Sequence, residues 1–179
     1  MKHYRSKPTD SEQARVVVVH CSDPRYQPHF QDFLQGGLGL KNYGLIAIPG
    51  GIELLSPSEI NGVLRYQGLL WMSFMVSLMN AERCVLIAHG DCRWYIEQGI
   101  ELSVHRLREH QTQDMEAVRK QIHLRFPFLA LELYYAQIEG EHAAFELMNS
   151  SGSTSKRPTT KRTRTADPEF FPSFPWPQG

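Results

Sequence analysis

Two short motifs carry the side chains best suited to chemistry. Cys21, Asp23 and Arg25 lie in VVVVHCSDPRY, and His89 and Cys92 lie in VLIAHGDCRWY. Thiolates and imidazoles are the ligands that zinc prefers in proteins. Three such ligands leave one position of a tetrahedral ion open, which is typical of a catalytic rather than a structural zinc site. We therefore interpret Cys21, His89 and Cys92 as a candidate zinc-binding set.

Each motif follows a predicted buried strand. Residues 16–19 form a continuous β-branched run that ends at His20 and Cys21, and residues 83–88 (RCVLIA) form a second apolar run before His89. Ligands of an open parallel sheet bind outside the carboxyl ends of its strands. Parallel pairing of these strands would therefore bring Cys21 and His89 together, although 68 positions (89 minus 21) separate them.

A crossover helix is predicted between the two strands. Residues 43–48 (YGLIAI) predict a further strand that stops at Pro49-Gly50-Gly51. Ser56, Pro57 and Glu59 supply an N-cap, a first-turn proline and a capping-box acid, so we expect a helix over residues 57–80. Its apolar run at 68–79 is too short to span a bilayer and predicts a buried core helix, in which Trp71, Phe74 and Met75 pack in the core or line an apolar pocket.

The remaining elements complete an α/β fold. Helical spacing predicts helices over residues 94–110 and 114–126. Alternating residues predict strands over 131–138 and 142–147, joined by a tight turn at 139–141. The predicted fold class is a mostly parallel β-sheet flanked by helices, with an antiparallel edge hairpin.

Length and composition predict one domain with two polar extensions. The 179 residues suit a single core. We expect an N-terminal arm over 1–14, a zinc-binding α/β domain over 15–149 and a disordered basic, proline- and aromatic-rich tail over 150–179. The end of the tail, EFFPSFPWPQG, is suited to docking on an unknown protein.

Charge and cysteine content narrow the function classes. Nineteen basic and nineteen acidic residues cancel, which argues against a nucleic-acid or membrane partner. The tail alone is basic, with five Lys or Arg against two Asp or Glu. Three cysteines and no cleavable apolar N-terminal segment predict a reduced protein with a cytoplasmic localisation.

Two other readings of the cysteines fit less well. The phosphatase loop His-Cys-x5-Arg needs six positions from nucleophile to arginine, whereas Cys21 and Arg25 are four apart, and Asp23 would repel a phosphate. Thiol redox chemistry usually uses a Cys-x-x-Cys pair, which Cys21 lacks. Cys84 lies in the middle of a predicted strand and is interpreted as an inert core thiol.

The two motifs resemble those of the β-class carbonic anhydrases, which have Cys-x-Asp-x-Arg after one strand and His-x-x-Cys after a later one. The likeness extends to YGLIAIPGG, where the family has a strand and a small-residue loop, and to LMNAERCVLIAHGDC, where it has the strand into its second motif. LYYAQIEGEHAAFELM is similar to the closing edge hairpin of the family. About three quarters of the chain is covered, and the tail is not.

The resemblance implies hydration of carbon dioxide to bicarbonate. Zinc would be bound by Cys21, His89 and Cys92, and the hydroxide formed from its bound water would attack the substrate. Asp23 would accept a hydrogen bond from that hydroxide, and Arg25 would keep Asp23 ionised and oriented. If the pair breaks, Asp23 would become the fourth ligand and close the site. The resemblance also implies a homodimer or a higher homo-oligomer.

Departures from the family pattern keep other functions open. Arg93 and Trp94 follow the second cysteine, where the family has glycine, and the small-residue loop continues into Ile52 instead of ending in asparagine. These changes touch no ligand but affect the expected substrate pocket. The alternatives are a hydrolase of a related small electrophile, such as carbonyl sulfide or carbon disulfide, and a non-catalytic metal-binding scaffold.

Overall fold

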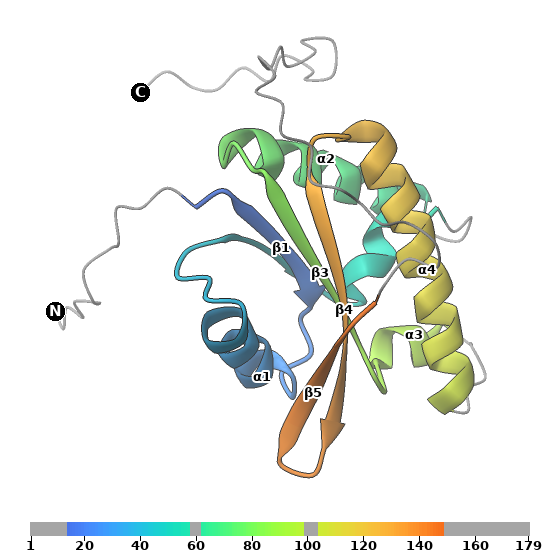
Figure 1. Cartoon of the computed structure of the whole chain (residues 1–179). Coiled ribbons are helices and arrows are strands. Elements are labelled where there is room, and N and C mark those ends of the chain that lie inside the picture. The colour runs from blue at the N-terminus through green and yellow to red at the C-terminus, as the bar shows by residue number, and fades with distance from the viewer. Residues whose placement is uncertain (1–13, 58–61, 99–103, 149–179) are drawn as a thin grey trace, which may run out of the picture.

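The computed structural model describes residues 14–57, 62–98 and 104–148, so the predicted arm (except residue 14) and tail lie outside the described residues. Five strands form one sheet in the order β2-β1-β3-β4-β5 (Figure 1). They are β1 (Val16–Cys21), β2 (Gly44–Ile48), β3 (Arg83–His89), β4 (Ala130–Glu139) and β5 (His142–Leu147). The first four in this order pair in parallel and β5 is antiparallel to β4, so the predicted α/β fold class with its edge hairpin is confirmed.

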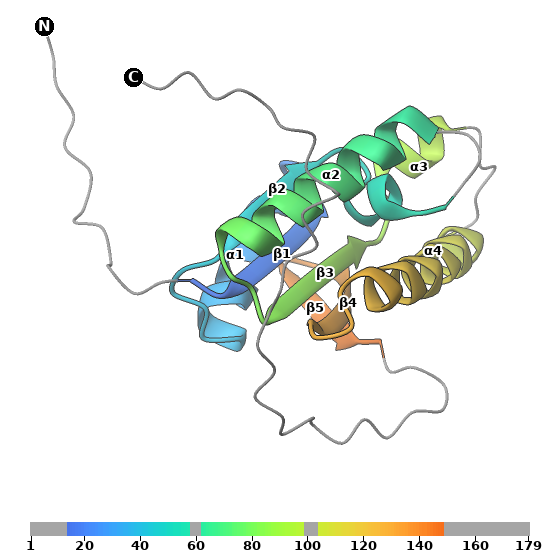
Figure 2. The same ribbon diagram turned by 90° about the horizontal axis from the view of Figure 1, so that it is seen from above.

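Helices cover both faces of this sheet (Figures 1 and 2). The α-helices are α1 (Gln27–Asp32), α2 (Gly62–Leu78), α3 (Arg93–Glu97) and α4 (Val104–Arg125). A π-helical turn, η1 (Phe33–Gly37), continues α1, and a 3-10 helix, η2 (Gly51–Leu55), follows β2. The helices α2 and α4 lie over one face and α1 over the other (Figure 2).

Alternate residues of the central strands supply the two cores. Val17 and Val19 pack with residues of α2 and α4, whereas Val18 packs with Phe30 of α1. A strand covered on both faces has no solvent face to mark with polar residues, which explains the continuous valine run of β1. The same reasoning accounts for β3, in which Cys84 to Ala88 are all buried.

The predicted division of the C-terminal helices is wrong. We expected helices over 94–110 and 114–126, but α3 is only five residues long and α4 continues unbroken through 111–113. Neither glycine nor proline interrupts this stretch, and the Thr112 hydroxyl donates to the Arg108 carbonyl within the helix. The predicted start of the crossover helix at 57 cannot be followed, because residues 58–61 lie outside the described residues, as does its capping acid, Glu59.

The prediction that residues 68–79 form a buried core helix is wrong for one side of α2. Met72 and Val76 are buried against the sheet, but Trp71 and Phe74 are each 43% exposed and Leu78 is 60% exposed. Trp71 and Phe74 therefore do not complete the core of this chain, whereas Met75 is partly buried against it. No described helix is long and apolar enough to cross a membrane.

Candidate metal centre

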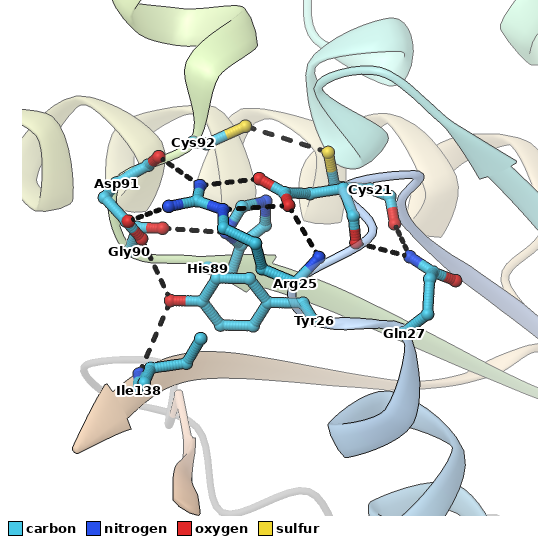
Figure 3. Close-up of polar contacts among 10 residues, drawn as sticks. Cys21, Arg25, Tyr26, Gln27, His89, Gly90, Asp91, Cys92 and Ile138 are labelled. Atoms are coloured by element: carbon cyan, nitrogen blue, oxygen red, sulfur yellow. Dashed lines mark hydrogen bonds and ion pairs between the residues drawn. The ribbon is translucent and has the colours of Figure 1, made fainter. Parts of the chain in front are cut away.

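The three predicted ligands meet at one edge of the sheet. Cys21 is the last residue of β1 and His89 is the last residue of β3. These strands pair in parallel with His20 opposite Ile87, so Cys21 and His89 lie at the same edge of the sheet. Cys92 follows three residues later, directly before α3. All three side chains are buried, and their ligand atoms lie within 4.8 Å of one another (Figure 3).

The spacing and the donor atoms fit a tetrahedral zinc ion. The Sγ atoms of Cys21 and Cys92 are 3.8 Å apart. Two sulfurs about 2.3 Å from one tetrahedral zinc would be separated by about 3.8 Å. Nδ1 of His89 donates to the Gly90 carbonyl at 2.7 Å, since a carbonyl can only accept, and Nε2 is left as a lone-pair acceptor. That Nε2 is buried and has no hydrogen-bond partner among the described residues, which is the state of a histidine prepared to bind a metal.

The contact between Cys21 and Cys92 favours the thiolate form of Cys21. The hydrogen bond from Cys92 is the largest cause that lowers the pKa of Cys21 to about 4. The same contact, together with burial, raises the pKa of Cys92. The contact between the two sulfurs therefore favours ionisation of Cys21, and the thiolate is the form of cysteine that binds a metal.

An acid–base pair lies beside the ligands. The Arg25 guanidinium holds Asp23 through two hydrogen bonds, from Nε to Oδ1 at 3.0 Å and from Nη2 to Oδ2 at 2.7 Å. These bonds are the main reason why the pKa of Asp23 is lowered. The predicted pairing of Asp23 with Arg25 is therefore present, and the carboxylate is ionised at neutral pH.

The glycine-rich loop after β2 approaches the site closely. A Cβ atom on Gly51, which has a φ of +53°, would lie 2.6 Å from the backbone nitrogen of Cys21. A Cβ atom on Gly50, with a φ of +76°, would lie 2.3 Å from the indole of Trp94. The Trp94 Nε1–H donates to Glu53 of η2 at 3.0 Å. The two glycines therefore let this loop pack against both β1 and α3.

The departures from the expected motif lie in different surroundings. The Arg93 side chain is exposed on α3. Trp94 is half-buried in a small cluster with Cys21, Cys92, Tyr95 and Leu107, so it forms part of the wall around the ligands. Ile52 is fully buried in the larger core under α2 and α4.

Two residues of this site were not predicted from the sequence. Asp91, inside the His-x-x-Cys motif, contacts Arg25, and Tyr26 donates to Asp91. The Tyr26 ring also packs against the His89 ring, with the centroids 4.1 Å apart and the planes tilted by 45°. An acid directly before a candidate ligand and a tyrosine directly after a candidate arginine were visible signals, but nothing in the linear order joins positions 26 and 91.

Comparison with known proteins gives similarity in structure only. No protein-family model matches the chain, and no curated protein matches it. Among solved structures, the chain is similar to the β-carbonic anhydrase CafA of Aspergillus fumigatus, with 10% identity, a TM-score of 0.48 and coverage of 79% of this chain and 78% of that one.

Two further solved structures are similar to the same degree. A β-carbonic anhydrase isoform I from Trichomonas vaginalis has 11% identity and a TM-score of 0.47, over 79% of this chain and 87% of that one. A tetrameric β-carbonic anhydrase from Sordaria macrospora has 13% identity and a TM-score of 0.41, over 75% and 81%. At these identities and TM-scores the likeness identifies neither a family nor an activity.

Replacing Cys92 by serine should abolish stoichiometric metal binding, because two of three ligands do not hold zinc tightly. Under reducing, chelator-free conditions we expect about one zinc per wild-type chain and less than about a tenth of that in Cys92→Ser, measured by elemental analysis after gel filtration. Cys84→Ser is the matched control, since Cys84 is buried in the middle of β3 and should leave the zinc content unchanged. Equal zinc in both variants would contradict the assignment of the ligands.

Proposed function

We propose that this protein hydrates carbon dioxide to bicarbonate with zinc held by Cys21, His89 and Cys92. The observation that carries the proposal is the convergence of two thiols and an unpartnered His89 Nε2 beside an ionised acid–arginine pair. Three protein ligands leave a position for water, as hydration requires. The likeness of both motifs to those of the β-class carbonic anhydrases supports the same reaction.

The bound zinc would supply acidity, which yields hydroxide from water near neutral pH. Two thiolates neutralise the double charge of the ion, so this acidification is weaker than with three neutral imidazoles. A hydrogen-bond acceptor beside the open position is correspondingly more important. The chain provides one in Asp23, whose side chain is only 8% exposed.

One of the two carboxylate oxygens of Asp23 is better suited to accept a hydrogen bond from the nucleophile. Oδ1 of Asp23 takes two donors, the backbone N–H and the Nε–H of Arg25, each at 3.0 Å. Among the described residues, Oδ2 accepts only from Nη2 of Arg25. A carboxylate oxygen accepts about two hydrogen bonds, so Oδ2 keeps one lone pair for the proton of the nucleophile. Arg25 holds the carboxylate ionised and in this orientation.

Two other functions use the same ligands. Carbonyl sulfide or carbon disulfide would meet the same nucleophile, and Trp94 beside the candidate ligands changes the wall that such a substrate would contact. A non-catalytic metal-binding scaffold would also need Cys21, His89 and Cys92 but not Asp23. Asp23→Ala should therefore impair the proposed enzyme but leave the function of a metal-binding scaffold unchanged.

Asp23→Ala should lower the rate of carbon dioxide hydration by about 10- to 100-fold, the usual loss when a partner of a metal site is removed. The reason is that the nucleophile loses its acceptor while the three ligands stay in place. The measurement is stopped-flow hydration by zinc-loaded full-length protein, with Cys92→Ser as the blank and zinc content measured in each sample. A wild-type rate equal to the blank, or an unchanged rate in Asp23→Ala, would contradict the proposal.

We also propose that the protein forms a homodimer through one side of α2. This surface, the α2 face, consists of exposed Tyr66, Trp71, Phe74 and Leu78. No charged residue occurs between Arg65 and Glu82, so the α2 face has none of the charges that usually mark a solvated helix surface. Among the described residues, the adjoining edge strand β2 pairs only with β1. A second copy would cover both the helix side and this edge.

Phe74→Glu should convert the dimer into a monomer, because the substitution places a charge in the middle of the α2 face. Light scattering after gel filtration should give about 41 kDa for the wild type, twice the 20.6 kDa chain, and about 21 kDa for Phe74→Glu. Leu124→Glu is the matched control, since Leu124 is 83% exposed on α4, away from this face. A monomeric wild type, or a Phe74→Glu variant of unchanged mass, would overturn the proposal.

A further inference from the structure

Arg25 is held by two carboxylates rather than one. Besides its two bonds to Asp23, its Nη1 donates to Oδ2 of Asp91 at 2.5 Å, and its Nη2 donates to the Asp91 carbonyl at 3.0 Å (Figure 3). Four of the five guanidinium N–H donors can be used in these contacts. Arg25 therefore joins the loop after β1, which carries Asp23, to the loop after β3, which carries Asp91.

Asp91 is itself fixed from a third element. Its Oδ1 accepts from the Tyr26 hydroxyl at 3.1 Å, and that hydroxyl accepts from the backbone N–H of Ile138 on β4 at 3.4 Å (Figure 3). The backbone of Asp91 has a φ of +44°, a conformation that Asp and Asn adopt more readily than most residues. Both carboxylate oxygens of Asp91 are thus occupied, one by Arg25 and one by Tyr26.

The two carboxylates differ in their surroundings. The Asp23 side chain is 8% exposed, whereas the side chains of Arg25 and Asp91 are 44% and 48% exposed. Asp23 is the inner acid and Asp91 the outer one, with the guanidinium between them. An arginine on the surface that is held by a single acid changes rotamer easily, because an exposed ion pair is weak. The second acid removes this freedom.

Releasing Arg25 would leave the buried Asp23 carboxylate without its cation. An unpaired buried carboxylate is costly, so it would bind the nearest available cation. With a metal held by Cys21, His89 and Cys92, that cation is the metal, because carboxylate oxygens are ordinary zinc ligands. Loss of the outer acid would therefore fill the position that hydration needs open.

We propose that Asp91 is a positioning residue, which holds Arg25 from the outer side so that Asp23 stays paired with it and away from the metal. The inference rests on the proposed function, since it assumes a metal at Cys21, His89 and Cys92. The Asp91 side chain would contact neither the metal ligands nor the substrate. It acts through Arg25 and then Asp23.

The test replaces Asp91 by asparagine in the full-length, cobalt-substituted protein. Asparagine keeps the shape and tolerates the positive φ, but it removes the charge that strengthens the bond to Arg25. Azide binding, followed in the visible spectrum of cobalt, reports an open coordination position without relying on activity. We expect azide to bind at least about tenfold more weakly to Asp91→Asn than to the wild type, at unchanged cobalt content.

Two further variants separate positioning from damage to the fold. Asp91→Asn combined with Asp23→Asn should recover azide binding close to that of the wild type, because a neutral amide is a poor fourth ligand. Glu146→Gln is the matched control, because Glu146 also forms a 2.5 Å ion pair with an arginine, Arg108, on the surface. The azide affinity of this variant should equal that of the wild type.

The outcomes distinguish the two proposals. Wild-type protein that takes up no cobalt would overturn the proposed function itself. Wild type that binds azide, together with Asp91→Asn that binds it equally well, would overturn only the role of Asp91. The role of Asp91 would also be overturned if Asp91→Asn lost its cobalt, or if the added Asp23→Asn substitution failed to recover azide binding. Wild type that binds cobalt but not azide would overturn it as well.

Discussion

The parallel pairing of β1 with β3 is the constraint on which the candidate site depends. Its register places His20 opposite Ile87, and continuing it by one residue brings Cys21 level with Ala88, next to His89. The backbone hydrogen bonds of both strands are buried under helices on each face, so a shift in this register would break them and move every valine of β1 to the opposite side. The position of the ligands is therefore as stable as the centre of the sheet.

The charges around the site are arranged in two groups. The inner group contains Cys21, Cys92 and His89, which are all buried. The outer group contains Asp23, Arg25 and Asp91, two acids around one base. A divalent cation in the inner group would neutralise two thiolates, while Asp23 of the outer group, kept ionised by Arg25, remains a hydrogen-bond acceptor. This division separates holding a metal from orienting a nucleophile.

The sequence predicted the sheet and the inner group better than it predicted their surroundings. Continuous apolar runs, glycine-rich turns and reactive residues at strand ends are local signals, and they were sufficient for β1, β3 and the hairpin. The helix α1 was missed, because QPHFQD is short and owes its place to Phe30, which packs in the core next to Tyr26. The contact of Asp91 with Arg25 depends on tertiary structure alone, since it joins two loops 66 positions apart.

The exposed side of α2 shows a different limit of pattern-based prediction. A helix that is apolar on all sides predicts complete burial, and within one chain this is wrong for Trp71, Phe74 and Leu78. A hydrophobic pattern predicts that a helix surface is buried, but it does not predict whether the same chain or another chain buries it. The α2 face is therefore the basis of the proposed interface and not part of the core.

X-ray absorption at the zinc edge of the loaded, reduced protein tests the central claim most directly, because it reports which atoms surround the ion. We expect two sulfurs at about 2.3 Å and two lighter ligands, nitrogen or oxygen, at about 2.0 to 2.1 Å. A single sulfur, a third sulfur, or a zinc surrounded by oxygen alone would show that Cys21, His89 and Cys92 do not hold the metal together.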